Sequence, residues 1–114
     1  NKTLKDVVVR YKTMAGFYAP YVPGFDCHGL PIEHKIQEDI GPGWRDVPIA
    51  EMRKRCHAHA QSFIEKQSAQ FQRVGVLGDW SNPYKTMAPE YESAVLEVFA
   101  RLVERGLVYR QLKP

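Results

Sequence analysis

The stretch that organises this sequence is Tyr21-Val22-Pro23-Gly24-Phe25-Asp26-Cys27-His28-Gly29-Leu30-Pro31-Ile32-Glu33. It joins the end of an apolar segment, a turn-forming pair, an acid, an imidazole and the start of a helix. Proline fixes φ and glycine accepts sharp-turn angles, so Pro23-Gly24 predicts that a strand ends there. No other stretch gathers so many groups able to bind a small molecule, and the segments around it are expected to position it.

Working outward, the flanking segments predict helices that each bury one apolar face. Helices are expected over residues 2–15, 49–74 and 89–105, where apolar residues recur at helical spacing, and a shorter one from Gly29 to Ile40 with Pro31 in its first turn. The expected buried residues are Leu4, Val7, Val8, Tyr11 and Met14 in the first helix, Ile49, Met52, Cys56, Ala60, Phe63, Ile64, Phe71 and Val74 in the long one, and Tyr91, Val95, Val98, Phe99, Leu102 and Val103 in the last.

Strand signals are few. Residues 17–22 and 107–112 are rich in β-branched and aromatic residues, and Pro20 favours an irregular or edge strand for the first. Residues 44–48 predict a loop in which Asp46 caps the long helix. A helix, a strand and a helix in succession indicate half of an α/β unit. The fold class is therefore α/β, an incomplete core that is mostly helical with few strands.

Composition bounds the function. The 114 residues suit one domain, and the net charge of +3 is mildly basic. Lys2, Lys5, Arg10 and Lys12 near one end and Arg101, Arg105, Arg110 and Lys113 near the other either attract RNA or form solvated helix faces, and charge alone favours solvated faces. Two unrelated cysteines fit a reducing cytoplasm, and no run approaches a membrane span. A start at Asn1 and an end inside an expected strand suggest part of a longer chain.

Asp26 is the leading candidate site residue, because it follows the expected strand at the sheet edge where α/β proteins bind ligands. It suits an ammonium group or a ribose hydroxyl, or it caps the helix that follows, and the residues alone leave both open. His28 either serves as a donor, acid or base or bonds a backbone carbonyl, which is favoured. Trp80 either stacks on a base or, as favoured, packs its loop. His57 and His59 are two apart on a helix, so they do not share a metal.

The run from Pro23 to Glu33 resembles the class I aminoacyl-tRNA synthetases for isoleucine, valine and leucine, and Cys27-His28-Gly29-Leu30-Pro31-Ile32-Glu33 is similar to the isoleucyl family in its bacterial form. Residues 75–87, 106–114 and 1–6 also resemble that family, in order along the whole chain. Phe25 stands where the bacterial enzymes usually carry Trp, which preserves the aromatic character.

The resemblance implies a Rossmann-type catalytic domain that activates isoleucine with Mg-ATP and transfers it to tRNA(Ile). It implies that Asp26 binds the α-ammonium of isoleucine or its adenylate, with Pro23, Gly24, Phe25 and His28 shaping that corner. Catalytic phosphate-handling motifs, the editing insertion and the zinc segments would lie outside these residues, so no catalytic or metal residue is expected within them and the isolated chain is expected to be inactive.

Within one partial catalytic domain, residues 1–40 would form part of the Rossmann half, residues 41–88 a long helix and linker, and residues 89–114 a helix and strand leading to the editing insertion. The alternative is a free-standing, non-enzymatic helical module that binds RNA or protein through its basic ends.

Overall fold

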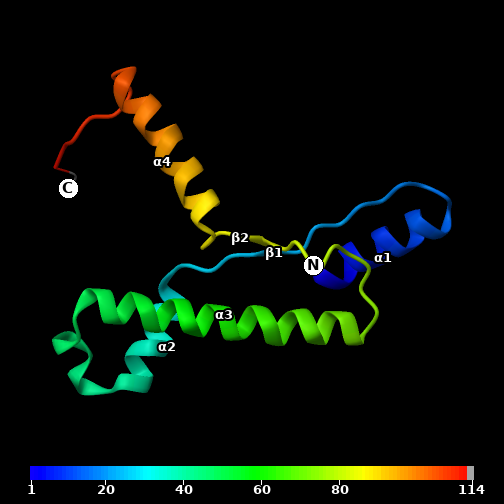
Figure 1. Ribbon diagram of the computed structural model, residues 1–114, viewed down its shortest axis with the longest axis horizontal. Coiled ribbons are helices and arrows are strands. Elements are labelled where there is room, and N and C mark those ends of the chain that lie inside the picture. Colours follow the sequence, from blue (N-terminus) through cyan, green and yellow to red (C-terminus); the bar gives the residue numbers. More distant parts are fainter. Residues whose placement is uncertain (113–114) are drawn as a thin grey trace.

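The computed structural model describes residues 1–112, which form four α-helices, one 3₁₀ helix and two short strands (Figure 1). In chain order these are α1 (Lys2–Met14), β1 (Gly24–Phe25), α2 (Leu30–Ile40), η1 (Pro42–Asp46), α3 (Ile49–Arg73), β2 (Tyr84–Lys85) and α4 (Pro89–Glu104). The four α-helices begin and end within one or two residues of the positions expected from periodicity, so that part of the prediction is confirmed. The mostly helical content with few strands is confirmed as well.

β1 and β2 form a two-stranded parallel sheet in which Gly24 lies opposite Tyr84 and Phe25 opposite Lys85. Backbone hydrogen bonds extend this pairing in both directions. The amide of Asp79 donates to the Tyr21 carbonyl at 2.9 Å, Tyr84 donates to Pro23 at 2.8 Å and Thr86 donates to Phe25 at 3.2 Å. Two segments far apart in the sequence therefore lie side by side at the centre of the molecule (Figure 1).

The predicted strands at residues 17–22 and 107–112 are wrong, since both segments lack strand structure. Pro20 cannot donate to a ladder, and the described residues place no strand beside 17–20. The partner of the central strand is β2, which is too short to show a strand pattern in sequence. Pro23-Gly24 also does not end a strand, because both residues belong to the paired segment and the strand begins at Gly24.

The expected cap at Asp46 is wrong too. Asp46 ends the 3₁₀ helix η1, and α3 starts after Pro48 with no side-chain hydrogen bond at its cap. Of the segment expected to be a loop, residues 44–46 belong to the 3₁₀ helix η1, whereas Val47 and Pro48 are the connection to α3.

The core is small and lies where α2 packs on α3. Cys27, Ala60 and Ile64 are buried together, and Phe25, Ile32 and Met87 pack against them at the margin. Ile36 and Pro23 are buried as well. The Cα radius of gyration is 19.0 Å, against about 13 Å for a compact domain of this length. The molecule is therefore extended, with limited apolar burial.

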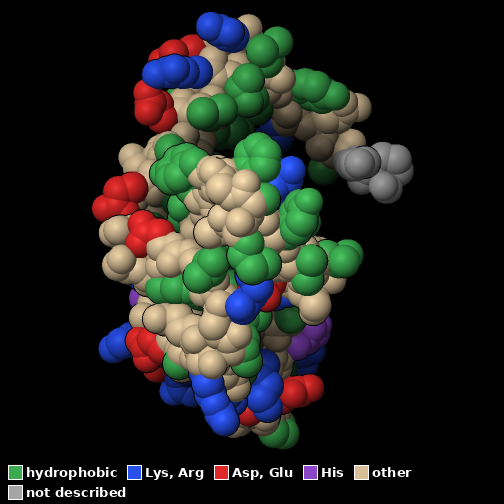
Figure 2. Space-filling view, turned by 90° about the vertical axis from the view of Figure 1, so that its right-hand side faces the viewer, with side chains coloured by type: hydrophobic (Ala, Val, Ile, Leu, Met, Phe, Trp, Pro, Cys, Tyr) green, Lys and Arg blue, Asp and Glu red, His purple; other side chains and the backbone are tan. Residues whose placement is uncertain are grey.

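The apolar faces predicted to be buried on α1 and α4 are instead exposed. Leu4 is 71% exposed and Val98 58% exposed. Tyr91 at the start of α4 is the exception, since it is half-buried and packs edge-on against Tyr84 of β2. Figure 2 shows apolar side chains spread over the surface of one side of the molecule. On α3 the prediction holds only in part. Ala60 and Ile64 are buried and Met52, Cys56 and Phe71 are half-buried, whereas Ile49, Phe63 and Val74 are exposed.

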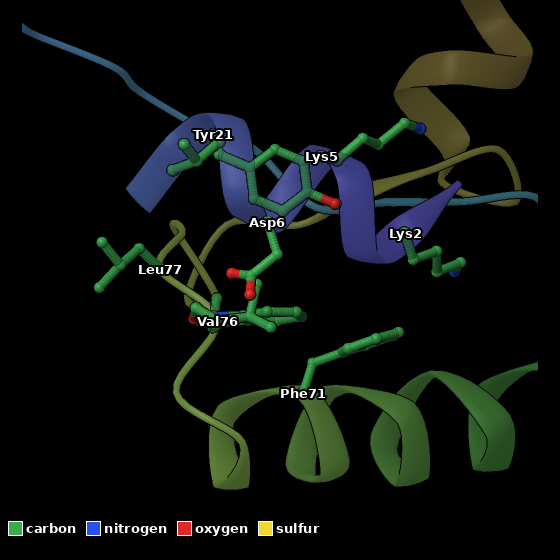
Figure 3. Close-up of a pocket in the computed structure, with 9 residues that line it drawn as sticks. Lys2, Lys5, Asp6, Tyr21, Phe71, Val76 and Leu77 are labelled. Carbon is green, nitrogen blue, oxygen red and sulfur yellow. The ribbon is translucent and has the colours of Figure 1, made fainter. Parts of the chain in front are cut away.

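Arg10 is the main side chain that ties α1 to the rest of the fold. Its guanidinium donates to the carbonyl oxygens of Val74 at 3.0 Å and Gly75 at 2.6 Å, and to Asp6 Oδ2 at 2.8 Å. It thereby satisfies carbonyls that the end of α3 leaves without helical partners. Beside this contact, α1, Tyr21, the end of α3 and residues 76–80 line a narrow pocket (Figure 3).

None of the helices in the described part of the chain is long and apolar enough to cross a membrane.

Gly78 should be essential for the approach of the two paired segments. A Cβ at this position would lie 3.0 Å from Tyr21 Cδ1 and 3.2 Å from the Tyr21 carbonyl oxygen. Overpacking of this kind costs about 1–3 kcal/mol. We expect Gly78→Ala to speed amide hydrogen exchange at Asp79 and Tyr84 by roughly 5- to 150-fold, since local opening sets that rate.

The control is Gly43→Ala, because a Cβ at Gly43 would meet no atom within 4 Å. Equal exchange in the two variants would contradict the close approach at Tyr21.

Candidate functional site

The site lies at the edge where both strands of the sheet end. Asp26 follows β1 and Thr86 follows β2, and the parallel register brings these two residues opposite each other. The carboxyl ends of parallel strands are where open α/β sheets bind ligands. The local fold thus places an acid and a hydroxyl together at the edge predicted to hold the site.

Asp26 is exposed, and its Oδ1 faces two donors. The backbone amide of His28 lies 3.4 Å from it and the hydroxyl of Thr86 lies 3.5 Å from it. The interpretation of Asp26 as a helix cap is wrong, because α2 is preceded by Gly29 at its cap and has no side-chain cap hydrogen bond. Oδ2 accepts no hydrogen bond from the described residues, so one carboxylate oxygen can accept from a ligand.

His28 points back to the second strand segment. Its Nε2 lies 3.2 Å from the Thr86 carbonyl oxygen and 3.9 Å from Glu92 Oε1. A ring N–H at Nε2 donates to the carbonyl, which is the role favoured for His28 from sequence. His28 therefore links the loop after β1 to the loop after β2 and the start of α4.

Two clefts open beside the sheet edge. One, of about 380 Å³, is lined by Gly24, Phe25 and Asp26 together with Ile32 of α2 and, from α3, His59, Ala60, Phe63 and Ile64. The other, of about 870 Å³, is lined by Cys27 and His28, by Glu33, Trp44, Met52 and Cys56, and by Met87 and Glu92. Asp26 and Lys2 are the acidic and basic residues of the first cleft, and apart from Gln67 and His59 its other walls are largely apolar. The Asp26 carboxylate in these surroundings suits an ammonium group that carries an apolar substituent.

The predicted site residues are therefore partly assembled. Gly24, Phe25 and Asp26 line one cleft, His28 lines the neighbouring cleft, and Pro23, directly before β1, is fully buried.

Trp80 has the packing role favoured from sequence. Its ring stacks on Phe71 with centroids 6.1 Å apart, and its Nε1 donates to the Val76 carbonyl at 3.0 Å. Its indole therefore belongs to the junction between α3 and the loop that leads to β2. Within residues 1–112 no group of three or more histidine, cysteine or acidic side chains could hold a metal ion.

Thr86 is the residue that sequence reasoning missed. Lys85-Thr86-Met87 carries no glycine-rich phosphate-loop pattern, and nothing in its local sequence marks a strand. Recognising Tyr84-Lys85 as the parallel partner of Gly24-Phe25 would have placed Thr86 opposite Asp26. The signal exists only in the pairing, which is nonlocal.

Comparison with known proteins gives one consistent family. The model described as "tRNA synthetases class I (I, L, M and V)" matches residues 1–114. The isoleucine–tRNA ligase of Brachyspira hyodysenteriae is 55% identical over 113 residues, which cover 99% of this chain and 12% of that protein. The isoleucine–tRNA ligases of Thermotoga maritima and Brevibacillus brevis are 54% and 51% identical over 100% and 99% of the chain, respectively. The chain spans about an eighth of the length of these curated relatives, 12% in each case.

These comparisons confirm the resemblance to bacterial isoleucyl enzymes drawn from residues 23–33 and from the stretches that accompany it.

Cys56 lies in the wall of the larger cleft and is half-buried. Burial raises the pKa of its thiol, and the negative charge of Glu33 raises that pKa further. At a given pH the thiolate fraction is therefore smaller than in an ordinary exposed cysteine. Since the thiolate is the reactive form, Cys56 should react slowly.

We expect Glu33→Gln to speed alkylation of Cys56 by iodoacetamide near pH 8, because loss of the nearby charge lowers the pKa of the thiol. Peptide mapping by mass spectrometry would follow Cys56 separately from the buried Cys27. Glu38→Gln is the control, since Glu38 lies on the same helix and contacts Lys35 instead. An unchanged alkylation rate in Glu33→Gln would show that the charge of Glu33 does not raise the pKa of the Cys56 thiol.

Proposed function

Because the chain belongs to the class I tRNA synthetases that include the isoleucine, leucine, methionine and valine enzymes, we propose that it forms part of an isoleucine–tRNA ligase. In this proposal the whole protein acts in the cytoplasm, activates isoleucine with ATP and transfers it to tRNA(Ile). Isoleucine–tRNA ligases that match nearly the entire chain at 51–55% identity support it. The match of all 114 residues to one enzyme family speaks against a free-standing binding module.

The single observation that carries the proposal is the position of Asp26. The carboxylate stands at the carboxyl edge of a parallel sheet, beside a cleft with apolar walls. An amino acid with a branched aliphatic side chain has the two matching features, a cation and an apolar group. A carboxylate–ammonium hydrogen bond is charge-assisted and directional, so it would fix the α-carbon of isoleucine relative to the strand end.

The remaining site residues would then act as walls. Pro23 is buried and accepts a ladder hydrogen bond from Tyr84 at 2.8 Å, which fixes the strand on which Gly24 and Phe25 face the cleft. Phe25 offers an aromatic surface to the substrate. His28, bonded to the Thr86 carbonyl, would hold the loop that follows Asp26.

We assign the phosphate chemistry to parts of the protein other than these 114 residues. ATP with Mg²⁺ enters as a substrate, and stabilising the phosphoryl charge requires positioned cations or donors. In the same proposal residues 1–40 belong to a Rossmann-type half, residues 41–88 form a helix and linker, residues 89–114 lead to the editing insertion, and the zinc-binding segments lie elsewhere. This chain would supply the amino-acid side of the site.

The direct test is a chimera in which residues 1–114 replace the matching 114 residues of the Thermotoga maritima ligase, to which they are 54% identical. We expect the chimera to catalyse isoleucine-dependent ATP–pyrophosphate exchange. Asp26→Asn should raise the KM for isoleucine, because losing a hydrogen bond to a charged group costs about 1.5–3 kcal/mol, equivalent to roughly 10- to 150-fold. The KM for ATP should change little.

Asp39→Asn provides the matched control, because Asp39 pairs with Lys35 on the exposed side of α2. An isoleucine KM that is equal in the two variants would exclude Asp26 as the ammonium ligand. A folded parent chimera that activates no isoleucine would contradict the proposed function itself.

A further inference from the structure

We propose that Thr86 is a positioning residue that orients the Asp26 carboxylate for the substrate ammonium. This inference rests on the proposed function and assigns a role to a residue that the sequence did not mark. The supporting observation does not depend on a ligand. The amide, the carbonyl and the hydroxyl of Thr86 all contact the segment from Phe25 to His28.

The backbone of Thr86 makes two of these contacts. Its amide donates to the Phe25 carbonyl oxygen at 3.2 Å, which extends the ladder by one bond beyond β2. Its carbonyl oxygen accepts from the His28 ring, with Nε2 3.2 Å away. Phe25 and His28, which flank Asp26 and Cys27, are thus both bonded to Thr86, which lies 60 positions after Asp26 in the chain.

The hydroxyl of Thr86 makes the other two contacts. Oγ1 accepts from the backbone amide of Cys27 at 2.9 Å and lies 3.5 Å from Asp26 Oδ1. Because the oxygen accepts from Cys27, its own hydrogen is free to point at the carboxylate. Cys27 is only 5% exposed, so its amide has little access to water and depends on this hydroxyl.

The consequence concerns the two oxygens of the Asp26 carboxylate. Oδ1 faces the Thr86 hydroxyl at 3.5 Å and the His28 amide at 3.4 Å. These two long contacts favour one orientation of the carboxylate, in which Oδ2 is left to accept from the ammonium. Loss of the hydroxyl should free this rotation and disturb the backbone at Cys27. The effect should appear in isoleucine binding, because Thr86 would act through Asp26 and not on ATP.

The test uses the full-length chimera with the Thermotoga maritima ligase. Thr86→Val keeps the branched shape but removes the hydroxyl, and Thr86→Ser keeps the hydroxyl. We expect Thr86→Val to raise the isoleucine KM by about tenfold, since a hydrogen bond to a charged group is lost, with the ATP KM unchanged. Thr86→Ser should restore the isoleucine KM to within about threefold of the parent value.

A double-mutant cycle separates positioning from general packing. In an Asp26→Asn background, Thr86→Val should raise the isoleucine KM no further. Thr13→Val is the control for removing a threonine hydroxyl, because Thr13 Oγ1 bonds only its own helix at the Val9 carbonyl. If Thr86→Val is insoluble, Thr86→Ala removes the hydroxyl without a new methyl group and should show the same split.

Three outcomes would overturn the inference. The first is an isoleucine KM in Thr86→Val within twofold of the parent. The second is a full additional loss in the Asp26→Asn background, and the third is failure of Thr86→Ser to restore the KM. Each of these leaves the proposed function intact, since the parent chimera still activates isoleucine. A parent chimera that is folded but inactive would overturn both.

Discussion

The structure depends on one nonlocal contact, the parallel pairing of residues 21–25 with residues 79–86. Three backbone hydrogen bonds, accepted by alternate carbonyls of Tyr21, Pro23 and Phe25, hold the two segments together. Closing the intervening loop carries an entropic cost that grows slowly with its length. The intervening segment is itself folded, because α2 packs on α3 and Ala60 and Ile64 are buried with Cys27. Strand pairing and helix packing therefore support each other at the point where the site forms.

This arrangement also anchors the backbone on both sides of the Asp26 carboxylate. Pro23 and Cys27 are buried on either side of the exposed Asp26, so the carboxylate projects from a fixed backbone. The apolar faces of α1 and α4, by contrast, remain open to solvent. Exposed apolar faces of this extent are typical of surfaces that bind a protein, a ligand or a membrane. The buried apolar residues of the described chain thus gather around the segment that carries the candidate site.

Much of the helical structure could be predicted because helical periodicity is local. The apolar spacing in α3 and the glycine after it define that helix within a residue or two. The strands could not be predicted, because each has only two residues and forms only by pairing with a partner about 60 positions away. The same limit applies to the site. Asp26 stands out beside Pro23-Gly24, but Thr86 becomes visible only once β2 is placed beside β1. The prediction that the apolar faces of α1 and α4 are buried was wrong for a related reason. Periodicity gives the direction of an apolar face but not what covers it.

The central claim is that the Asp26 carboxylate receives the α-ammonium of isoleucine. The most direct measurement is a crystal structure of the Thermotoga maritima chimera with a non-hydrolysable analogue of isoleucyl-adenylate. We predict that the ammonium nitrogen lies about 2.7–2.9 Å from an Asp26 carboxylate oxygen, with the aliphatic side chain in the cleft beside Phe25. An ammonium held by other acceptors, with Asp26 beyond hydrogen-bonding distance, would contradict the account.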